Sequence, residues 1–353
     1  MRFDYRRRSG HGRRRERRTL PLMLEHLRLT VPPDLVQGVL DLVTEHECIT
    51  NVVRHEGVCL VPEGDLIECD VARETTSEVL DDLHRLGLSR QGGVLVMTPD
   101  STPFVEAGRI AALAPGDPED AVIWPEVVER AEAAGRLTVT YLIFMVLAVV
   151  LAAIAVLTDS PILVVGAMVV GPEFGTIAAI SVGVVLGKWA IAGRGSTVLV
   201  GGFVIAILVV ALLALAASWG GLIGAAMLRT ARPQTEFIWR PDSWSLVVAL
   251  VAGTAGVLAM TTDRANAMVG VFISVTTVPA AGNFALALAL GDGPEMVGSA
   301  QQLGLNLLGM VLAGCFVVLM QRLLWDKVLR LSERVFRYGD RAALSARARD
   351  LAP

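Results

Sequence analysis

One acidic residue falls where an ionisable group is costly. Glu173 lies in the segment Gly171-Pro172-Glu173-Phe174-Gly175, in the middle of a long apolar stretch. Ionisable groups in such stretches usually face a cavity or a partner and often mark a solute or proton pathway. Proline lacks the backbone N–H and glycine loosens the chain, so this segment predicts a helix break that frees polar backbone groups. A neutral Glu173 that only caps a broken helix is the alternative.

A second interruption follows in the segment Val278-Pro279-Ala280-Ala281-Gly282-Asn283, which hydroxyl-bearing threonines precede. If the two breaks meet, they form one polar, asymmetric site with a single negative charge, which suits a cation or a proton-coupled solute. The predicted binding residues are Glu173, Thr176, Thr276, Thr277 and Asn283. The predicted helix-break residues are Gly171, Pro172, Gly175, Pro279 and Gly282.

The two breaks belong to two copies of one pattern. Each copy has an aspartate, a glycine at the same interval after it and then a Pro-x-x-Gly motif: Asp159, Gly166 and Pro172-x-x-Gly175, then Asp263, Gly270 and Pro279-x-x-Gly282. Each copy lies in a block of about three membrane-length segments, and an odd number of crossings inverts the second copy. This predicts an inverted repeat, an architecture common among secondary transporters. Chance similarity between Gly/Ala/Val-rich helices is the alternative.

The repeated aspartates close the first and fourth predicted spans. Asp159-Ser160-Pro161 is typical of a helix start, with an oxygen-bearing cap and proline in the first turn. Asp159 and Asp263 are therefore predicted to be caps of the repeat, and ion gating is the alternative for both.

Hydropathy predicts an integral membrane protein. Apolar residues make up 53% of the 353-residue chain, and a run of about 18 apolar residues suffices for a transmembrane helix. Six spans are predicted, of which the second and the fifth are long and broken: residues 138–157, 161–188, 196–219, 244–260, 265–290 and 302–324. The lipid bilayer is thus the first expected partner.

The distribution of basic residues predicts the orientation. Lys and Arg near helix ends favour the cytoplasmic side, and here they collect on the side of the N-terminal domain and the C-terminal tail. Both termini are therefore predicted to be cytoplasmic in a bacterial plasma membrane. The segment 220–243 on the other side is an exception, predicted to be a solvated loop rather than an anion funnel despite its basic residues, Arg229, Arg232 and Arg240.

Residues 1–22 predict a disordered basic arm, since nine of the first 18 residues are Arg. Such an arm would be attracted to the anionic lipids of the inner leaflet. A translation start at Met23 is the alternative. The arm lacks the interleaved aromatic residues that stack on bases, so no nucleic-acid partner is expected.

Residues 23–98 alternate strand and helix patterns in the order β-α-β-β-α-β, which predicts a cytoplasmic ferredoxin-like, or ACT-like, domain. Residues 99–137 are predicted to be a linker followed by a juxtamembrane helix at Trp124–Gly135. The transmembrane domain follows at 138–325, and a basic cytoplasmic tail at 326–353. A ferredoxin-like fold serves enzymes, sensors and dimer interfaces, so it does not decide the function.

No catalytic or cofactor motif is recognisable. The chain has no G-x-S-x-G, no Walker loop and no Rossmann glycine pattern after a strand. Cys48, Cys59 and Cys69 match no zinc spacing, and Cys315 lies in an apolar helix, so all four are interpreted as small hydrophobic residues. Metal binding or oxidation sensing by the first three is the alternative. We therefore expect a non-enzymatic protein without metal or cofactor. We also expect the protein to be a homo-oligomer.

The repeat segments also carry a resemblance. Residues 160–175, SPILVVGAMVVGPEFG, together with residues 270–283, GVFISVTTVPAAGN, resemble a prokaryotic family of hydrophobic-domain membrane proteins known as a domain of unknown function, DUF389. The resemblance covers the membrane region and extends to the preceding α/β module. It implies an integral membrane protein with a small cytoplasmic domain and no assigned activity.

Two classes of function follow. The first is a secondary transporter or channel for a small solute or ion, with its site at the two broken helices and a regulatory cytoplasmic domain. The second is a membrane-anchored effector sensor or signalling protein without transport. Polar residues in the breaks favour transport.

Overall fold

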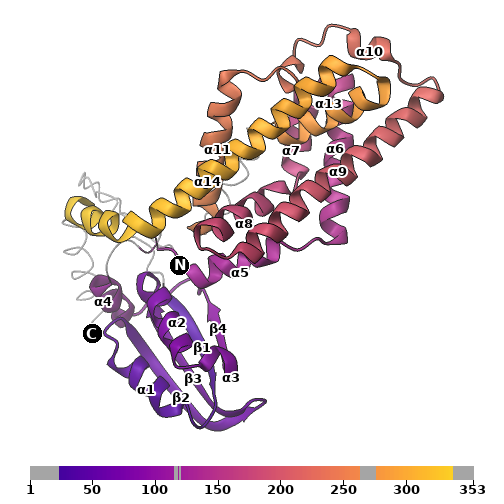
Figure 1. Cartoon of the computed structure of the whole chain (residues 1–353). Helices are drawn as coiled ribbons and strands as arrows, with labels where there is room; N and C mark the ends of the chain where they lie inside the picture. Colours follow the sequence, from indigo (N-terminus) through magenta and orange to yellow (C-terminus); the bar gives the residue numbers. More distant parts are fainter. Residues whose placement is uncertain (1–23, 115–117, 119–120, 263–275, 337–353) are drawn as a thin grey trace, which may run out of the picture. The chain divides into compact units, whose positions relative to one another are not determined.

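The computed structural model describes residues 24–114, 118, 121–262 and 276–336, without the side chains of residues 225, 229 and 324–336. The chain divides into two compact units (Figure 1). The first contains residues 24–75 and 82–114, and the second contains the described residues of 76–81 and 115–338. The predicted basic arm at 1–22, Asp263 and the tail beyond residue 336 lie outside the described residues.

An antiparallel sheet in the order β2-β3-β1-β4 dominates the first unit. Its strands are β1 (Leu24–Val31), β2 (Ile49–Leu60), β3 (Glu63–Ala72) and β4 (Gly93–Met97). The connections are α1 (Val36–Glu45) between β1 and β2, and η1 (Arg73–Thr75), α2 (Thr76–Arg85) and α3 (Leu88–Gln91) between β3 and β4. The strands and main helices follow one another in the order that the sequence predicts.

One face of the sheet forms the core of this unit. Side chains alternate across a strand, and Leu27 and Leu29 of β1 are fully buried, as are Ile67 and Cys69 of β3. Burial raises the pKa of the Cys69 thiol to about 12. Cys69 is therefore a protonated core residue at physiological pH, in line with its interpretation as a small hydrophobic residue.

The predicted linker at 99–137 contains two helices. Helix α4 (Val105–Leu113) packs Ala107 and Ile110 against Leu24 of β1, so the core of the first unit continues beyond residue 98. Helix α5 (Trp124–Ala134) coincides with the predicted juxtamembrane helix, with proline in its first turn and Gly135 after its last residue.

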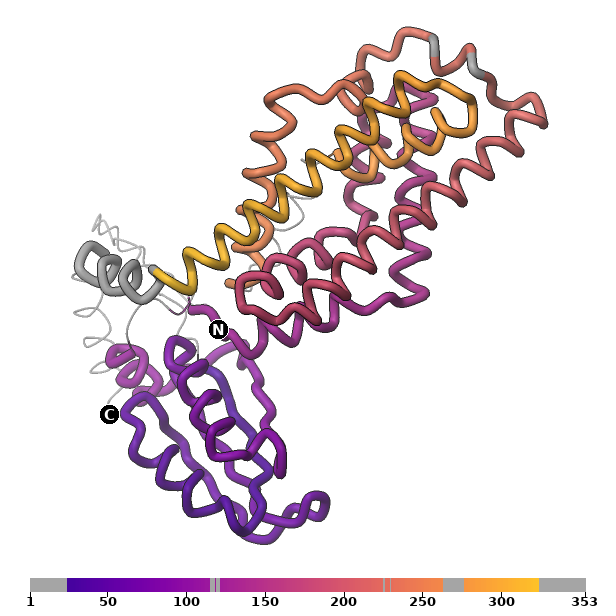
Figure 2. Tube along the Cα trace, viewed as in Figure 1, coloured from indigo at the N-terminus to yellow at the C-terminus, as the bar shows by residue number. Residues whose placement is uncertain are grey.

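Helices make up the second unit. Figure 2 follows the trace through them in order. After α5 they are α6 (Val139–Leu157), α7 (Pro161–Val170), α8 (Glu173–Val185), α9 (Trp189–Trp219), α10 (Ala225–Arg229), η3 (Glu236–Ile238), α11 (Ser243–Thr261), α13 (Thr277–Leu290) and α14 (Gly293–Phe336).

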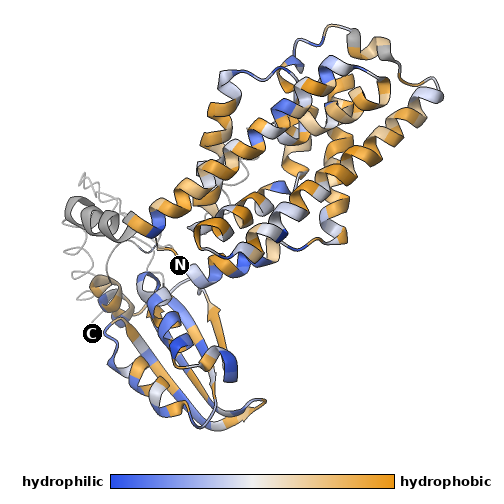
Figure 3. Ribbon diagram, viewed as in Figure 1, coloured by the Kyte–Doolittle hydropathy of each residue, from blue (hydrophilic) through white to orange (hydrophobic). Residues whose placement is uncertain are grey.

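Four helices are long and apolar enough to cross a membrane: α6, α9, α11 and the Gly293–Leu323 part of α14. Helices α7 and α8 meet the same test as a pair bent by 51°. The described residues therefore hold up to five spans rather than the six predicted, because α13 has only 14 residues and residues 263–275 before it are outside the described part. Figure 3 shows these helices as predominantly hydrophobic, as expected of a multi-pass membrane protein.

A buried ion pair joins two strand ends in the first unit. The Arg73 guanidinium donates to Glu25 Oε1 at 2.7 Å, and the Thr98 hydroxyl donates to Glu25 Oε2 at 2.7 Å. Glu25 is fully buried and Arg73 is 4% exposed. Removal of one partner would leave a buried, uncompensated charge.

We therefore expect Glu25→Ala to destabilise the first unit by about 3–5 kcal/mol. Hydrogen exchange of peptides from residues 24–98 in the full chain would measure the loss of protection. The matched control is Glu56→Ala, which breaks the exposed pair with Arg54 and should cost less than about 1 kcal/mol. Equal losses in the two variants would contradict this account.

Candidate functional site

The predicted break in the second span is present. Helix α7 ends at Val170, and Gly171 has an extended conformation with ψ 127°. Pro172 then caps α8, which begins at Glu173. The two helices are bent by 51°. Proline cannot continue the hydrogen-bond ladder of α7, so the chain changes direction at the predicted residues.

Glu173 is buried at this break, with 8% of its surface exposed. Its Oε1 accepts a hydrogen bond of 2.7 Å from the Thr277 hydroxyl. Its Oε2 has no hydrogen-bond partner among the described residues and lies against Gly171, where a side chain would overlap it. Buried polar atoms are nearly always paired, so this oxygen marks a place where a proton, a water or a cation would be bound.

The N-termini of α8 and α13 meet at Glu173. Thr277 is the first residue of α13, and neither α8 nor α13 has a side-chain cap. The first backbone N–H groups of a helix have no partner within it, and its N-terminus carries a partial positive charge. Both ends therefore favour negative charge where the Glu173 carboxyl lies.

Uncharged polar side chains continue the site from Thr276, which precedes α13. The Thr276 hydroxyl accepts hydrogen bonds from Gln302 Nε2 at 3.0 Å and Asn306 Nδ2 at 2.9 Å, both on α14. Gln302 is buried, and its Oε1 has no hydrogen-bond partner in the described part of the chain. Neither amide is among the predicted binding residues, although the two lie one helical turn apart in an apolar helix, which is a recognisable signal.

Thr176 also lies at the break, as predicted. Its hydroxyl donates to the Glu173 carbonyl oxygen at 2.5 Å, and the Tyr141 side chain of α6 lies near both residues. The structure thus brings together Glu173, Thr176, Thr276 and Thr277, four of the five predicted binding residues.

The fifth predicted binding residue, Asn283, belongs to a different cluster. Its amide nitrogen donates to Glu295 Oε2 at 3.2 Å and to the Ser299 hydroxyl at 2.8 Å, and its amide oxygen accepts from Arg232 at 3.3 Å. Asn283 lies six residues beyond Thr277, which corresponds to about 9 Å along the helix axis. Grouping it with Glu173 was wrong, because α13 extends away from the break from Thr277 onward.

Arg232 also differs from its prediction as part of a solvated loop. It is 8% exposed and forms an ion pair with Glu295, and it donates to the Leu228 carbonyl oxygen at 2.9 Å. The loop after α9 folds back against the turn between α13 and α14, a contact that local charge patterns do not reveal. Arg240 does remain exposed, stacked on Trp239 and paired with Glu236.

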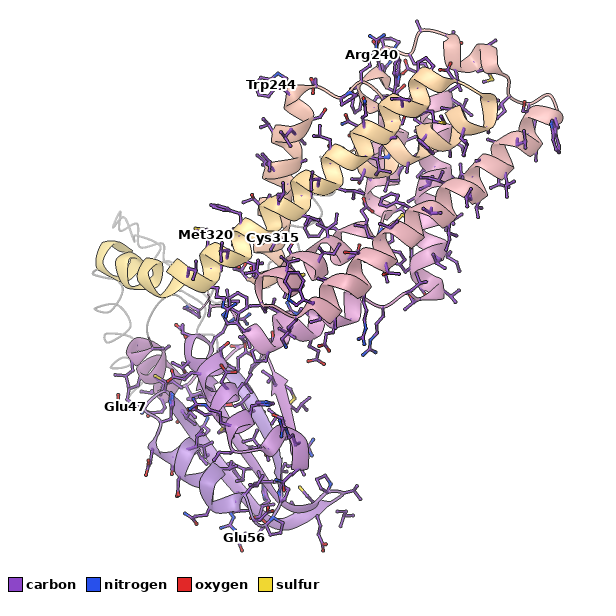
Figure 4. The ribbon with its side chains drawn as sticks, viewed as in Figure 1. Glu47, Glu56, Arg240, Trp244, Cys315 and Met320 are labelled. Atoms are coloured by element: carbon purple, nitrogen blue, oxygen red, sulfur yellow. The ribbon has the colours of Figure 1, made fainter. Side chains whose placement is uncertain are left out.

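An open cavity of about 460 Å³ lies beside this ion pair. Its polar walls include Arg232, Glu236, Asp292 and Glu295, with Trp239 as the aromatic member. We call this end of the second unit, with segment 220–242 and the α13–α14 turn, the loop end. Figure 4 labels Arg240 and Trp244 at this end.

Asp159 is not the cap that the sequence predicts. Ser160 caps α7 by accepting from the Leu163 amide at 3.4 Å. Asp159 instead accepts from the Thr235 hydroxyl at 2.8 Å and the Gln234 amide at 3.2 Å, so it fixes the loop.

The second predicted break does not fall at Pro279 and Gly282. Both residues lie within the continuous helix α13, and Pro279 is in the first turn, where its missing N–H costs nothing. Gly282 allows close packing instead, because a side chain there would lie 2.8 Å from the Ala153 amide of α6. Gly175 similarly packs against Ala134 of α5. Residues 263–275, which precede this helix, lie outside the described part of the chain.

In the described part of the chain, no group of three or more His, Cys, Asp or Glu residues is placed to hold a metal ion. The ligands available at the break are one carboxylate with amide and hydroxyl oxygens. Such hard oxygen atoms suit protons, water and hard cations.

Comparison with known proteins confirms the resemblance within the membrane region. A family model described as a domain of unknown function (DUF389) matches residues 168–312. The match contains the break, α8, α9, α11 and α13 and ends within α14. No curated protein and no solved structure matches the chain.

The Arg232–Glu295 pair gives a testable consequence. Arg232→Met or Glu295→Met alone should destabilise the second unit by about 3–5 kcal/mol, because each leaves one charge buried without its partner. The double variant should recover most of that loss. Thermal melting followed by tryptophan fluorescence would rank the variants. The control Arg240→Ala breaks the exposed pair with Glu236 and should change stability by less than about 1 kcal/mol. Additive losses in the double variant would show that the two side chains are not coupled.

Proposed function

We propose that this chain, whose residues 168–312 form a DUF389 domain, is a secondary transporter or channel for a small solute or ion. The observation that carries the proposal is the Glu173 carboxyl, buried among apolar helices with one oxygen unpaired within the described residues. Ionisable groups in such positions are costly and typically mark substrate or ion pathways.

Helix lengths support an inverted repeat as the frame for this site. Helices α6 and α11 each have 19 residues, and α9 and the apolar part of α14 each have 31. In the first block, α8 lies between α6 and α9 and has proline as its N-cap. In the second block, α13 lies between α11 and α14 and has proline in its first turn. Apart from α7, which precedes α8 in the first block, the described helices of the two blocks therefore share the order long helix, half helix, very long helix.

The contacts between the blocks are reciprocal. Helix α8 of the first block packs against α11 and α14, and α13 of the second block packs against α6 and α9. Helices α8 and α13 start next to each other at Glu173 and Thr277. From there α8 leads to the start of α9, whereas α13 leads to the loop end. Half helices that meet at their N-termini and diverge are typical of binding sites in transporters with inverted repeats.

The chemistry of the site favours a cation or a proton-coupled solute. Glu173 is acidic, and its neighbours at the break contribute hydroxyl and amide groups from Thr276, Thr277 and Gln302. An ionised Glu173 would attract a cation, and a protonated Glu173 would make the empty site neutral. Exchange between these states is a simple means of coupling solute movement to protons.

We also propose that the protein lies in a bacterial plasma membrane with both termini in the cytoplasm. Acidic partners accompany two of the basic residues at the loop end, in the pairs Arg232–Glu295 and Arg240–Glu236. At the opposite end, Arg136 and Arg194 are exposed without an ion pair among the described residues. Lys188 and Arg322 lie at that end too, so its basic residues outnumber those of the loop end, which favours it as the cytoplasmic one.

The first unit supports the alternative of a sensor. Its strand order, with antiparallel pairing throughout, is the one expected of a ferredoxin-like domain, a fold that serves effector binding as well as dimerisation. In our proposal it regulates transport. A sensor without transport would use the same domain but would not need Glu173.

The Glu173→Gln variant separates these functions. The amide keeps the shape of the side chain and removes its charge, so we expect it to fold but to lose ligand-induced thermal stabilisation. Since the solute is unknown, the wild type is first screened with monovalent cations, amino acids and polyols in detergent. Thr277→Val removes the hydroxyl next to Glu173 and should weaken the same response. Glu126→Gln, an acid-to-amide change on the partly exposed surface of α5, is the control and should respond as the wild type does.

If Glu173 were only a cap, Glu173→Gln would leave the ligand response intact and alter stability by about 1 kcal/mol, the scale of one hydrogen bond. A ligand whose stabilisation persists in both Glu173→Gln and Thr277→Val would bind elsewhere. That result would reject the transport site and favour the sensor.

Topology provides a second test. In a variant whose four native cysteines are replaced by Ser, we introduce a single cysteine at Pro233 or at Asp100, both of which are exposed. An impermeant maleimide should label position 233 in intact cells and position 100 only after permeabilisation. Labelling at position 100 in intact cells would overturn the orientation.

A further inference from the structure

A basic groove lies at the end of the second unit opposite the loop end. It has a volume of about 700 Å³ and is formed by the link between α5 and α6 and by the first turns of α9. The backbone of the link runs close over α9, because a side chain on Gly135 would lie 3.7 Å from the Gly195 amide. The lining residues are Gly135, Arg136, Leu137, Trp189, Ala190, Gly193, Arg194, Thr197 and Val198.

The charge of this groove is entirely positive. Arg136 and Arg194 are its charged members, and no acidic side chain lines it. Both arginines are exposed, and neither forms an ion pair among the described residues. Glu132, four residues before Arg136, is also exposed without an ion pair in that part of the chain. Two guanidinium groups without an acidic partner offer paired N–H donors that suit a phosphate group.

The surroundings of the groove are those of a membrane interface. The Trp189 side chain is 70% exposed and Leu137 is 53% exposed. Tryptophan prefers the headgroup layer of a bilayer. From the groove, the exposed apolar side chains continue along both spans: Val139 and Ile143 on α6, and Val200 and Val204 on α9. A ligand that fits this surface has an anionic head and a long apolar tail.

We propose that the groove binds an anionic phospholipid. The phosphate group would lie between Arg136 and Arg194, with Trp189 at the level of the headgroup. The acyl chains would lie along the exposed apolar residues of α6 and α9. A soluble phosphate would use the same two arginines but would leave Leu137 and Trp189 exposed, so the apolar surface favours the lipid. This inference is independent of the transport proposal.

The test uses the full chain in a mild, uncharged detergent. We expect phosphatidylglycerol to raise the melting temperature of the wild type by several degrees more than phosphatidylcholine does. The double variant Arg136→Gln/Arg194→Gln should lose at least half of that difference. The control Arg130→Gln/Arg322→Gln removes the same charge from residues outside the groove and should keep it. Native mass spectrometry would count the bound lipid directly in each protein.

Three results would overturn the proposal. Equal losses in the two double variants would show non-specific attraction to charge. A rise of the same size with inorganic phosphate would assign the groove to a soluble anion. Unchanged lipid retention in Arg136→Gln/Arg194→Gln would place the lipid elsewhere. If that double variant fails to fold, the single variants Arg136→Gln and Arg194→Gln are compared with Arg322→Gln, and the same three results decide.

Discussion

The interruption of one apolar helix at Gly171 and Pro172 determines the arrangement of the second unit. In an apolar surrounding, every polar backbone group must find a partner within the protein, and a helix that stops leaves several groups unpaired. Here the N-terminus of α8 meets the N-terminus of α13, and the Glu173 carboxyl lies between them with the Thr277 hydroxyl as its partner. Two ends with partial positive charge thus enclose one acidic group.

This meeting requires helices to approach closely on both sides. Gly183 of α8 lies against the backbone of Ala192 in α9, and Gly282 of α13 lies against the backbone of Ala152 and Ala153 in α6. A methyl group at either glycine would overlap backbone atoms, which cannot move aside as a flexible side chain can. Small residues in helical membrane proteins commonly serve this purpose. Several glycines that punctuate the sequence therefore control packing rather than flexibility.

Sequence patterns predicted features that depend on local chemistry and missed those that depend on long-range contacts. The strands of the first unit, α5 and the break at Pro172 follow from periodicity and from the missing proline N–H, so their positions were confirmed. The burial of Arg232 was not predictable, because its partners Glu295 and Asn283 are distant in sequence and only the folding of the loop joins them. The predicted break at Pro279 was wrong for a physical reason: proline breaks the interior of a helix but is well suited to its first turn, where Pro279 lies.

Helix α13 connects the two buried polar clusters. Thr277 at its start binds Glu173, and Asn283 nearly two turns later binds Glu295 and Arg232. Because a helix moves as a rigid element, a shift of α13 large enough to release Glu173 would also disturb the hydrogen bonds of Asn283 at the loop end. Release of Glu173 and loss of the hydrogen bonds of Asn283 to Arg232 and Glu295 would thus occur together. In the transporter that we propose, the polar contacts on this one short helix would supply the physical link that alternating access requires between the site and one face of the membrane.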